Sequence, residues 1–585
     1  MTASFSLPEA HLEAWRSLLL ASLQVVDAPP AAAQPSQGIL PCWFPEYSLD
    51  VYANLIVRHL PHAFEKPALK TVDRSGNALV YSYGEVDALV RIVAAALCLQ
   101  PGGKVAVISG PSIETAIVML ASAYLGCQHT VVIPSLPPES IAARLALFAP
   151  DLIIISPRYP ISAEATTGLS RVVTLKIAAQ QVWLDEATCS MQVPPGQQSA
   201  SYGASDPLFT LFTSGSTGFP KGIVHGATGY LLFAHYTSHY FFGLGPASTM
   251  LCGASSGWIN GHTYSLYAPL LHGATSVLVE DPVRLSMLQP LQDILVATGP
   301  TILYLPVTTV RILRSISAKV SPLDLPVQLA TIATMGEMLA PSIEQWYSNF
   351  FSGGLLPVVN TYFQTETGGI LCAKRFNDLP GIQLGEIGPL PWFVTMTAEQ
   401  GILELKDSVP GFMIDLLCPD HDKQLLKYFP SGCYCLHDYG SIEHGQLFCS
   451  GRSDDIINVR GIRLASGEIE SNALAIADFV ECAAVEYRDA LELINMRLFV
   501  VLRDAARLAD EAYGFRLLSQ LTALLRHNVS EQASPGSIVF VEALPKTISG
   551  KILRRLLRDL ELPANPVGMV LPLPESVQIT ILGSL

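Results

Sequence analysis

The stretch "LFTSGSTGFPKGIVHG", residues 211–226, is the most informative in the chain. It combines hydroxyl side chains, four glycines and a single cation, Lys221. A strand that ends at Phe212 and runs into such residues aims N–H groups and hydroxyls at an anion such as phosphate. Glycine lets the backbone approach that anion, where a Cβ would collide with it. The stretch therefore predicts a phosphate-binding loop.

This loop differs from the P-loop of mechanical ATPases. That motif, G-x-x-x-x-G-K-[ST], has glycine before its lysine and a hydroxyl after it. Here Pro220 precedes Lys221 and Gly222 follows it. The spacing excludes a P-loop ATPase, while a Gly/Ser-rich surface loop remains an alternative interpretation of these residues alone.

Short apolar runs alternate with helical spacing on both sides of the loop. The runs are "KVAVIS" (104–109), "HTVVIP" (129–134), "DLIIISPR" (151–158), "PLFTLF" (207–212), "ATSVLVE" (274–280), "PTILYLP" (300–306) and "LPVVNTYF" (356–363). Residues 112–126 have the spacing of a helix between the first two. This rhythm predicts parallel sheets covered by helices, with ligands at the strand ends.

The composition of the chain changes at 438–468, which is turn-rich and charged, as expected between two domains. We expect an α/β protein with a large N-terminal domain of parallel and mixed sheets and flanking helices, residues 1–453. Residues 454–585 are expected to form a small α+β domain, with strands at 496–504 and 537–544 and a helix through 515–527.

Composition limits the classes of partner and compartment. Of 585 residues, 50% are apolar and 15% charged, and the net charge of −15 argues against nucleic acid as the main partner. Eleven scattered cysteines favour reduced thiols in a cytoplasmic protein over a disulfide framework or a zinc site. The N-terminus predicts a surface or docking helix, followed by a flexible connector at 28–38. Since no apolar run approaches the ~18–20 residues that span a bilayer, we expect no membrane insertion.

Four further stretches supply groups that suit a nucleotide. "NTYFQTETGG" (360–369) offers Thr365 and Glu366, a carboxylate that can hold Mg²⁺ against phosphate oxygens. "HDYG" offers Asp438 for ribose hydroxyls, "GRSDD" offers Arg452, and "LPKTISGKILRR" (544–555) places Lys551 on a glycine turn. Taken singly, each is also typical of a solvated turn or a structural ion pair.

Together and in this order, these stretches resemble the adenylate-forming superfamily of acyl-CoA synthetases, adenylation domains and luciferases. The resemblance covers about residues 45 to 560. Its core motifs are matched by "TSGSTGFPKG", "TYFQTETGG", "GRSDDIINVRG" and "LPKTISGK". "GWINGHTYSLYAPLLHGATSVL" (257–278) and "WFPEYSLDVYANL" (43–55) resemble the acetyl-CoA and acetoacetyl-CoA synthetase branch.

The resemblance implies an activity. Such enzymes use ATP and Mg²⁺ to join a short-chain carboxylic acid to AMP, and then transfer the acyl group to coenzyme A while the small domain rotates. A mobile C-terminal domain is therefore expected. One alternative is a stand-alone adenylating enzyme that loads a carrier-protein phosphopantetheine. Another is a non-catalytic nucleotide-binding relative, against which the joint presence of the charged motif residues argues. Low charge and high apolar content leave a homo-oligomer open.

The resemblance also implies roles for individual residues. Lys551 would bridge the carboxylate and the α-phosphate, Thr365 would touch the α-phosphate and Glu366 would ligate Mg²⁺. Asp454 matches the hinge between the domains, and Gly461 matches the glycine of the pantetheine tunnel. The nucleotide is expected at Thr213, Ser214, Gly215, Ser216, Thr217, Gly218, Lys221, Gly336, Glu337, Gln364, Asp438, Arg452 and Arg463.

The chain departs from the family pattern at the acyl pocket, which is expected at Trp258, Ile259, Asn260, Met335 and Phe363. Acetyl-CoA synthetases usually carry tryptophan where Phe363 stands, so the pocket floor is lowered here. Met335 refills volume, and Asn260 offers a hydrogen bond to an oxygen of the substrate. A longer or polar-substituted acid is one interpretation, and compensating core substitutions with acetate still preferred are the other.

Two further differences concern the neighbouring motifs. Met338 replaces the usual proline of "GEP", and Arg460 precedes Gly461 where a small residue is usual. Arg460 therefore bears on whether the thiol acceptor is free CoA. His225 and His262 lie in matching segments, where packing is the expected role.

Overall fold

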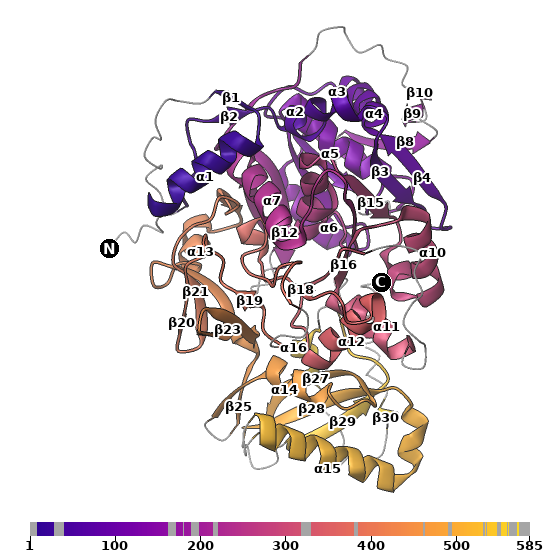
Figure 1. The fold of residues 1–585 in the computed structure, drawn as a ribbon, viewed down its shortest axis with the longest axis vertical. Helices are drawn as coiled ribbons and strands as arrows, with labels where there is room; N and C mark the ends of the chain where they lie inside the picture. Colours follow the sequence, from indigo (N-terminus) through magenta and orange to yellow (C-terminus); the bar gives the residue numbers. More distant parts are fainter. Residues whose placement is uncertain are drawn as a thin grey trace.

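The elements of Figure 1 belong to a computed structural model. It describes residues 9–27, 40–161, 171–178, 181–185, 187–188, 198–214, 220–317, 329–379, 384–459, 462–488, 494–529, 533, 535–546, 552–558, 560 and 570–571. The connector predicted at 28–38 lies outside these residues. No helix within them is long and apolar enough to cross a membrane.

The first large sheet carries the predicted phosphate-binding stretch. In the described residues it has nine strands, in the order β10-β9-β8-β7-β5-β6-β12-β13-β22. Their bounds are β5 (Lys104–Ile108), β6 (Gln128–Val132), β7 (Leu152–Ile155), β8 (Val172–Ala178), β9 (Gln181–Leu184), β10 (Ala187–Thr188), β12 (Pro207–Ser214), β13 (Pro220–Gly226) and β22 (Asp415–Leu417). Neighbours from β8 to β12 pair in parallel, and the outer pairs are antiparallel. The strands predicted at 104–109, 129–134 and 151–158 are confirmed.

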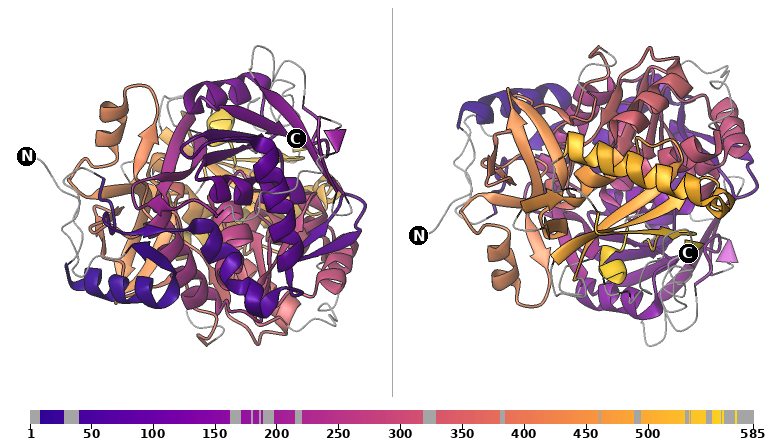
Figure 2. Two further views of the ribbon diagram at one scale, coloured as in Figure 1. Left: turned by 90° about the horizontal axis from the view of Figure 1, so that it is seen from above. Right: turned by 90° about the horizontal axis from the view of Figure 1, so that it is seen from below.

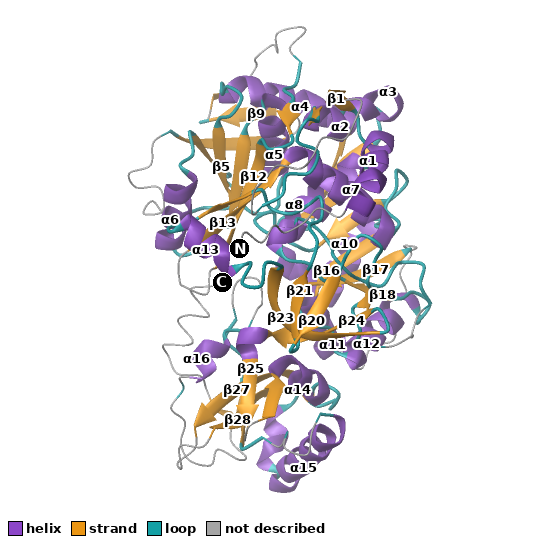
Figure 3. Ribbon diagram, turned by 90° about the vertical axis from the view of Figure 1, so that its left-hand side faces the viewer, coloured by secondary structure: helices purple, strands orange, loops and turns teal. Residues whose placement is uncertain are grey.

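The second large sheet has seven strands among the described residues, in the order β18-β17-β16-β14-β15-β3-β4. They are β3 (Pro67–Val72), β4 (Ala78–Ser82), β14 (Thr249–Cys252), β15 (Thr275–Val279), β16 (Ile302–Pro306), β17 (Thr331–Met335) and β18 (Val358–Asn360). Every pair is parallel except the β3–β4 hairpin. β15 lies on one side of β14, and the next strand in the chain, β16, lies on the other side of β14. The order in which successive strands are added to the sheet therefore reverses between β14 and β16. Figure 3 shows both large sheets with helices packed against them.

Helices cover and separate these sheets. In the large domain they are α1 (Glu9–Ser22), α2 (Val51–Leu55), α3 (Leu60–Ala63), α4 (Tyr83–Leu97), α5 (Ile113–Leu125), α6 (Pro138–Phe148), α7 (Ala227–Phe242), α8 (Ile259–His262), α9 (Ala268–Leu271), α10 (Leu288–Thr298), α11 (Val307–Ser317), α12 (Pro341–Ser352) and α13 (His421–Lys427). A capping box of Ser82 and Glu85 starts α4. α5 is buried along its whole length, as expected of a helix enclosed between layers. The helix predicted at the N-terminus is α1, whose Trp15 and Leu19 are buried.

Two smaller sheets complete the large domain in the described residues. A three-stranded sheet contains β1 (Val25–Asp27), β2 (Ser48–Leu49) and β11 (Tyr202–Gly203). A five-stranded sheet contains β19 (Gly388–Pro389), β20 (Met396–Glu399), β21 (Ile402–Leu405), β23 (Tyr434–Glu443) and β24 (Gln446–Arg452). The last two strands of the five-stranded sheet carry Asp438 and Arg452.

The C-terminal part is a smaller α+β unit at one end of the molecule's long axis (Figures 1 and 3). Its elements are β25 (Ile456–Val459), β26 (Ile462–Ala465), α14 (Ser466–Ala473), β27 (Phe479–Arg488), β28 (Ile494–Leu502), α15 (Glu511–Asn528), β29 (Ser537–Val541), α16 (Arg554–Arg558) and β30 (Val570–Leu571). α15 runs across the outer side of this unit, as Figure 2 shows from below. The predicted fold class, a large α/β domain followed by a small α+β domain, is confirmed.

The two parts share a hydrophobic core. Tyr347 and Phe350 of α12 belong to the same buried cluster as Ile469 of α14 and Met496 of β28. Polar contacts supplement it, since Arg503 Nη1 donates to Ser315 O at 2.9 Å. In this structure the C-terminal unit therefore packs directly against the β16–β18 side of the large domain.

Candidate active site

The phosphate-binding stretch forms a β-hairpin. Thr213 on β12 pairs with Lys221 on β13, and Ser214 pairs with Pro220. The strand therefore continues two residues beyond Phe212, where we predicted its end, because Thr213 and Ser214 find partners on the returning strand. The tip residues Gly215, Ser216, Thr217 and Gly218 lie outside the described part of the chain, as does the side chain of Ser214. The hairpin places Lys221 with its Nζ 5.0 Å from the centroid of the Tyr428 ring.

A short 3₁₀ turn at Thr365–Thr367 presents Glu366 near the hairpin. Gln364 N donates to Thr367 Oγ1 at 3.1 Å, and Thr367 Oγ1 donates to Gln364 O at 2.9 Å, so the turn closes on itself. The ring nitrogens of His225 on β13 face Thr365 O at 2.9 Å and Gly411 O at 3.1 Å. His225 thus ties the hairpin to the turn, which is the packing role expected of it.

Glu366 is an acidic group that Tyr428 connects to Lys221 of the hairpin. Tyr428 Oη donates to Glu366 Oε1 at 3.0 Å, and Met413 N donates to Glu366 O at 2.8 Å. Burial raises the pKa of this carboxyl, and the Tyr428 hydrogen bond opposes the rise. The described residues contain no cluster of three or more His, Cys, Asp or Glu side chains that could hold a metal alone. One carboxylate beside a phosphate-binding hairpin fits Mg²⁺, which is commonly bound by one or two carboxylates and substrate phosphates.

Asp438 lies at the meeting point of three donors. Tyr362 Oη and Gln364 Nε2 donate to its Oδ2 at 2.6 and 3.0 Å, and Arg452 Nη1 donates to its Oδ1 at 3.1 Å. Asp438 and Arg452 are direct neighbours across β23 and β24. The preceding residue, His437, has a left-handed backbone with φ +53°, which is unusual for a side chain of this type. The structure therefore brings Gln364, Asp438 and Arg452 together.

The loop after β17 contains Gly336 and Glu337. Gly336 has φ +92°, and a Cβ built there would meet nothing within 4 Å, so one face of this turn is open. Glu337 points elsewhere: its carboxylate forms an ion pair with Arg311 of α11, which also donates to Met338 O at 3.3 Å. Both residues were predicted to border the adenine base. Gly336 faces open space, whereas Glu337 is held in an ion pair.

Two of the predicted acyl-pocket residues meet at the carboxyl end of β17 in the second large sheet. Asn260 in α8 contacts Met335 at the end of β17, with Nδ2 3.0 Å from Met335 Sδ. Ile259 is buried, Trp258 is half-buried, and Phe363 is half-buried against the main core. The contact between Asn260 and Met335 brings two of the five predicted pocket residues together.

Several predicted residues lie beyond the described part of the chain. Lys551, Gly461 and Arg460 fall outside it, and the side chains of Asp454 and Arg463 are not described.

Sequence reasoning missed a group of ion-paired residues in the described part of the C-terminal unit. Arg554 Nη2 contacts Glu470 Oε2 at 2.7 Å, and its Nη1 contacts Asp455 Oδ2 at 3.2 Å. These carboxylates raise the pKa of the Arg554 guanidinium, against the effect of burial. The arginine pair that ends "SGKILRR" was the available signal.

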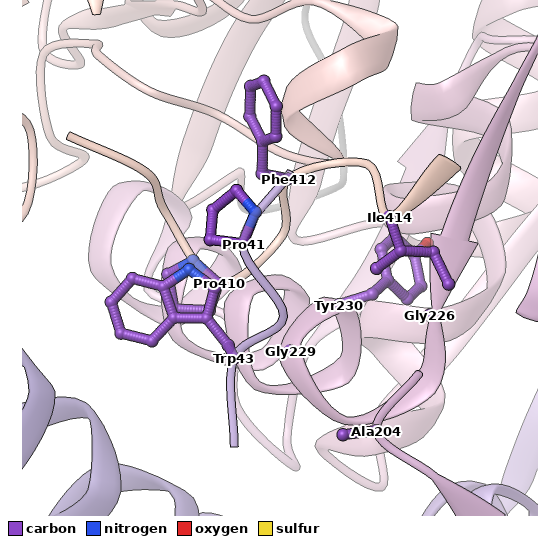
Figure 4. A pocket seen from close by; sticks show the side chains of 9 residues that line it. All are labelled: Pro41, Trp43, Ala204, Gly226, Gly229, Tyr230, Pro410, Phe412 and Ile414. Carbon is purple, nitrogen blue, oxygen red and sulfur yellow. The ribbon is translucent and has the colours of Figure 1, made fainter. Parts of the chain in front are cut away.

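A small pocket with mainly apolar lining residues lies beside the loop at 410–414 (Figure 4). It measures about 10 Å³ and is lined by Pro41, Trp43, Ala204, Gly226, Gly229, Tyr230, Pro410, Phe412 and Ile414. Its volume is that of about one water molecule, so it is too small for a nucleotide or an acid. Apart from Ala204, the lining residues come from the segment after residue 40, from β13 and α7, and from the loop at 410–414. That loop also contacts the Glu366 turn through the hydrogen bond from Met413 N to Glu366 O.

Two family models match the chain, and they do so on both sides of the predicted domain boundary. The model of the AMP-binding enzyme covers residues 61–398, and that of the AMP-binding enzyme C-terminal domain covers residues 468–551. The chain therefore belongs to the family of AMP-binding, adenylate-forming enzymes.

Particular relatives point to one branch of that family. The chain is 32% identical to the acetyl-coenzyme A synthetase of Caulobacter vibrioides over 88% of its own length and 85% of the relative's. It is 31% identical to that of Photobacterium profundum, with the same coverage. Among solved structures, the acetoacetyl-CoA synthetase from Streptomyces lividans has a TM-score of 0.77 at 20% identity, covering 97% of this chain and 92% of that one. The anthranilate CoA ligase AuaEII has a TM-score of 0.73 at 21% identity, covering 86% and 96%. These two likenesses establish the fold.

Proposed function

We propose that the protein is an acid–thiol ligase. It activates a short-chain carboxylic acid with ATP to an acyl-adenylate, releases pyrophosphate, and transfers the acyl group to the thiol of coenzyme A. The observation that carries this proposal is the convergence of Lys221, Glu366 and Asp438, from three separate segments, around Tyr428 and Gln364. The relatives named as acetyl-coenzyme A synthetases support the same reaction.

The proposed roles follow the chemistry of the groups. The β12–β13 hairpin and Lys221 hold the β- and γ-phosphates, Thr365 touches the α-phosphate, and Asp438 receives the ribose hydroxyls beside Arg452. Glu366 holds Mg²⁺, which when bound neutralises charge on the phosphates. The open face of Gly336 suits the flat adenine base, since a ligand can lie there without meeting a side chain.

The C-terminal unit supplies the remaining groups. Lys551 is proposed to balance the charge that builds between the carboxylate and the α-phosphate. We assign residues 1–453 to the large domain and 454–585 to the small mobile domain, with Asp454 at the hinge and Gly461 lining the path of the CoA thiol. The cysteines among the described residues are free thiols, which suits a reducing compartment such as the cytoplasm.

The test is pyrophosphate release with ATP and Mg²⁺ across short carboxylic acids, with and without CoA. Turnover that requires one acid and is accelerated by CoA, with acyl-CoA as the product, supports the ligase. Adenylate formation that CoA never accelerates would point to a carrier protein as acceptor. Absence of pyrophosphate release with every acid would contradict the proposal, provided that the purified chain is folded by circular dichroism.

A further inference from the structure

Asn260 lies at the point where the second large sheet reverses its strand order. Its backbone carbonyl accepts from the Cys252 thiol at the end of β14, at 3.7 Å, and its side chain reaches Tyr304 on β16 and Met335 on β17. In open α/β sheets the crevice at the carboxyl ends of the strands, at such a reversal, is where ligands bind. Asn260 therefore occupies a ligand-binding position of the fold.

A chain of hydrogen bonds determines which way the Asn260 amide points. Thr361 Oγ1 lies 2.9 Å from Thr334 O, and only the hydroxyl can supply a proton, so Thr361 donates. Because that proton is used, Thr361 Oγ1 accepts from Tyr304 Oη at 2.7 Å. The Tyr304 proton is then used as well, so Tyr304 Oη accepts from Asn260 Nδ2 at 3.0 Å. The amide nitrogen of Asn260 must face Tyr304.

This orientation leaves the amide oxygen of Asn260 without a donor. Asn260 is 3% exposed, and none of the described residues donates to its Oδ1. Rotating the amide by half a turn would set Oδ1 against Tyr304 Oη with no proton between them, so the network opposes that rotation. A buried acceptor that lacks a donor is unfavourable, and a bound group that donates to it gains affinity.

We propose that the acid activated by this enzyme carries a hydroxyl group that donates to Asn260 Oδ1. The inference rests on the proposed ligase function and names the class of its substrate: a short-chain hydroxy acid. A keto oxygen is itself an acceptor, so an oxo acid meets Oδ1 unfavourably. An unsubstituted acid leaves Oδ1 unpaired. An amino acid would place a cationic ammonium group beside the neutral amide of Asn260. Burying that charge without a counter-ion is costly.

The size of the preference follows from the chemistry of recognition. A hydrophobic pocket distinguishes one methylene by about 10- to 200-fold, whereas a site with a committed hydrogen-bonding group rejects an analogue that lacks its partner more strongly. We expect the hydroxy acid to exceed both its oxo and its unsubstituted analogue by at least ~10-fold in kcat/KM. Met335, which is flexible and contacts the same amide, can adjust around the added group.

The experiment compares acids with the same carbon skeleton. Pyrophosphate release and acyl-CoA formation are measured with butyrate, 3-hydroxybutyrate and 3-oxobutyrate, and with propionate, 2-hydroxypropionate and 2-oxopropionate. Asn260→Leu removes the acceptor at similar volume and is expected to lower the hydroxy-to-unsubstituted ratio by ~10-fold or more. Asn528→Leu, on α15, is the matched control and keeps the ratio of the native protein.

Tyr304→Phe tests the proton chain and does not depend on the folding of the Asn260 variant. Without the Tyr304 hydroxyl the amide can turn its Nδ2 toward the substrate, so the oxo-to-hydroxy ratio should rise. A purely structural role for Tyr304 would lower both activities and leave this ratio unchanged. Tyr347→Phe is the control, because Tyr347 is a buried tyrosine whose hydroxyl donates to Ala333 O at 3.4 Å.

The outcomes separate the two proposals. A native enzyme that activates an oxo or unsubstituted acid as well as its hydroxy analogue overturns the inference and leaves the ligase function standing; a water molecule on Oδ1 would give that result. An oxo-to-hydroxy ratio that Tyr304→Phe leaves unchanged also overturns it. Absence of turnover with every acid contradicts the ligase function, and with it the inference.

Discussion

Tyr428 lies between Lys221 and Glu366 and contacts both. Its hydroxyl donates to Glu366 Oε1 at 3.0 Å, and its ring centroid is 5.0 Å from Lys221 Nζ. One neutral side chain thus holds a cation against its π-face and a carboxylate at its hydroxyl. Lys221 and Glu366, both described, form no ion pair with each other, so both charges stay available to an incoming metal–nucleotide complex.

Replacing Tyr428 by phenylalanine separates its two contacts. Tyr428→Phe keeps the ring under Lys221 and removes the donor to Glu366. The hydrogen bond favours the ionised carboxylate, so its loss should raise the Glu366 pKa beyond the rise that burial already causes. We expect the Mg²⁺ concentration for half-maximal adenylation to increase by about 3- to 10-fold, because a typical hydrogen bond contributes about 0.5–1.5 kcal/mol.

The pH dependence of the Mg²⁺ effect distinguishes a raised Glu366 pKa from a general loss of structure in Tyr428→Phe. A carboxyl with a raised pKa ionises as the pH rises, so the defect of Tyr428→Phe should be larger at pH 6 than at pH 8. Magnesium titrations of pyrophosphate release at both pH values measure it. Tyr240→Phe is the control, because Tyr240 also lies under a cation, Arg375, at 5.6 Å. A defect of equal size at both pH values would contradict the role given to the hydroxyl.

Gly229 on α7 lines the small pocket of Figure 4, and its replacement tests the packing there. Alanine usually stabilises a helix relative to glycine by about 1 kcal/mol. At Gly229, however, a Cβ would lie 2.2 Å from Pro410 O. We expect Gly229→Ala to lower the free energy of unfolding by about 1–3 kcal/mol, as overpacking does.

Gly514 on α15 is the matched control for that substitution. The nearest atom to its Cβ would be Leu508 Cδ2 at 3.8 Å, an ordinary contact. Gly514→Ala should therefore raise the free energy of unfolding by up to ~1 kcal/mol. Urea denaturation measures both changes, and opposite signs are expected. Stabilisation by Gly229→Ala would show that the Pro410 loop moves away freely.

Two histidines in the main core should limit stability in acid. The Nε2 atoms of His129 and His262 are 3.2 Å apart, and both residues are fully buried. Burial lowers the pKa of His129 from 6.5 to about 3. Below pH 6.5 the unfolded chain binds a proton that the folded chain does not, so stability falls as the pH falls toward 3.

Comparison of the native protein with His129→Phe isolates the contribution of His129 to the loss of stability in acid. Between pH 7.5 and pH 5, the native protein should lose about 2 kcal/mol more of its unfolding free energy than His129→Phe, at 1.36 kcal/mol per pH unit below 6.5. The contrast is His421, whose pKa is raised by Asp422 and Asp415. The stabilisation that His421 contributes is present below pH 6.5 and is lost as the pH rises. His421→Asn should therefore enlarge the loss of unfolding free energy between pH 7.5 and pH 5. Equal acid losses in the native protein and His129→Phe would refute the assignment.

The ion pair between Glu470 and Arg554 should hold the last part of the C-terminal unit in place. Glu470 Oε1 also accepts from Ala484 N at 2.9 Å, so one carboxylate joins α14, β27 and α16. Glu470→Gln leaves a buried guanidinium with Asp455 as its remaining partner, and breaking buried pairs costs about 3–5 kcal/mol. Hydrogen exchange should accelerate across residues 462–488 and remain unchanged in β14.

An exposed ion pair in the same unit provides the comparison. Arg507 and Asp478 lie 3.1 Å apart with side chains 51% and 32% exposed. Asp478→Asn should change the exchange free energy by less than ~1 kcal/mol. If Glu470→Gln behaves like Asp478→Asn, Glu470 does not secure the segment that follows Lys551.

The parallel sheets could be predicted because their buried strands are continuous apolar runs, such as 104–109 and 302–306. The end of β12 could not, because Thr213 and Ser214 have loop-like side chains and are strand residues only through their partners on β13. Within the site, Lys221, Glu366 and Asp438 stand in recognisable motifs. Tyr428 and Tyr304 do not, since their importance comes from contacts with residues distant along the chain. The free acceptor of Asn260 depends on three successive hydrogen bonds, which no local pattern reveals.

The first helix of the described residues packs against segments that come much later in the sequence. Trp15 of α1 packs against Phe233 of α7 and against Trp392 and Phe393. During synthesis α1 therefore leaves the ribosome long before the surface that buries Trp15 exists. Until then the apolar side of α1 stays uncovered, and its docking shows that the segments up to Phe393 have come together. The environment of Trp15 is thus a natural reporter of how far folding has progressed on the ribosome.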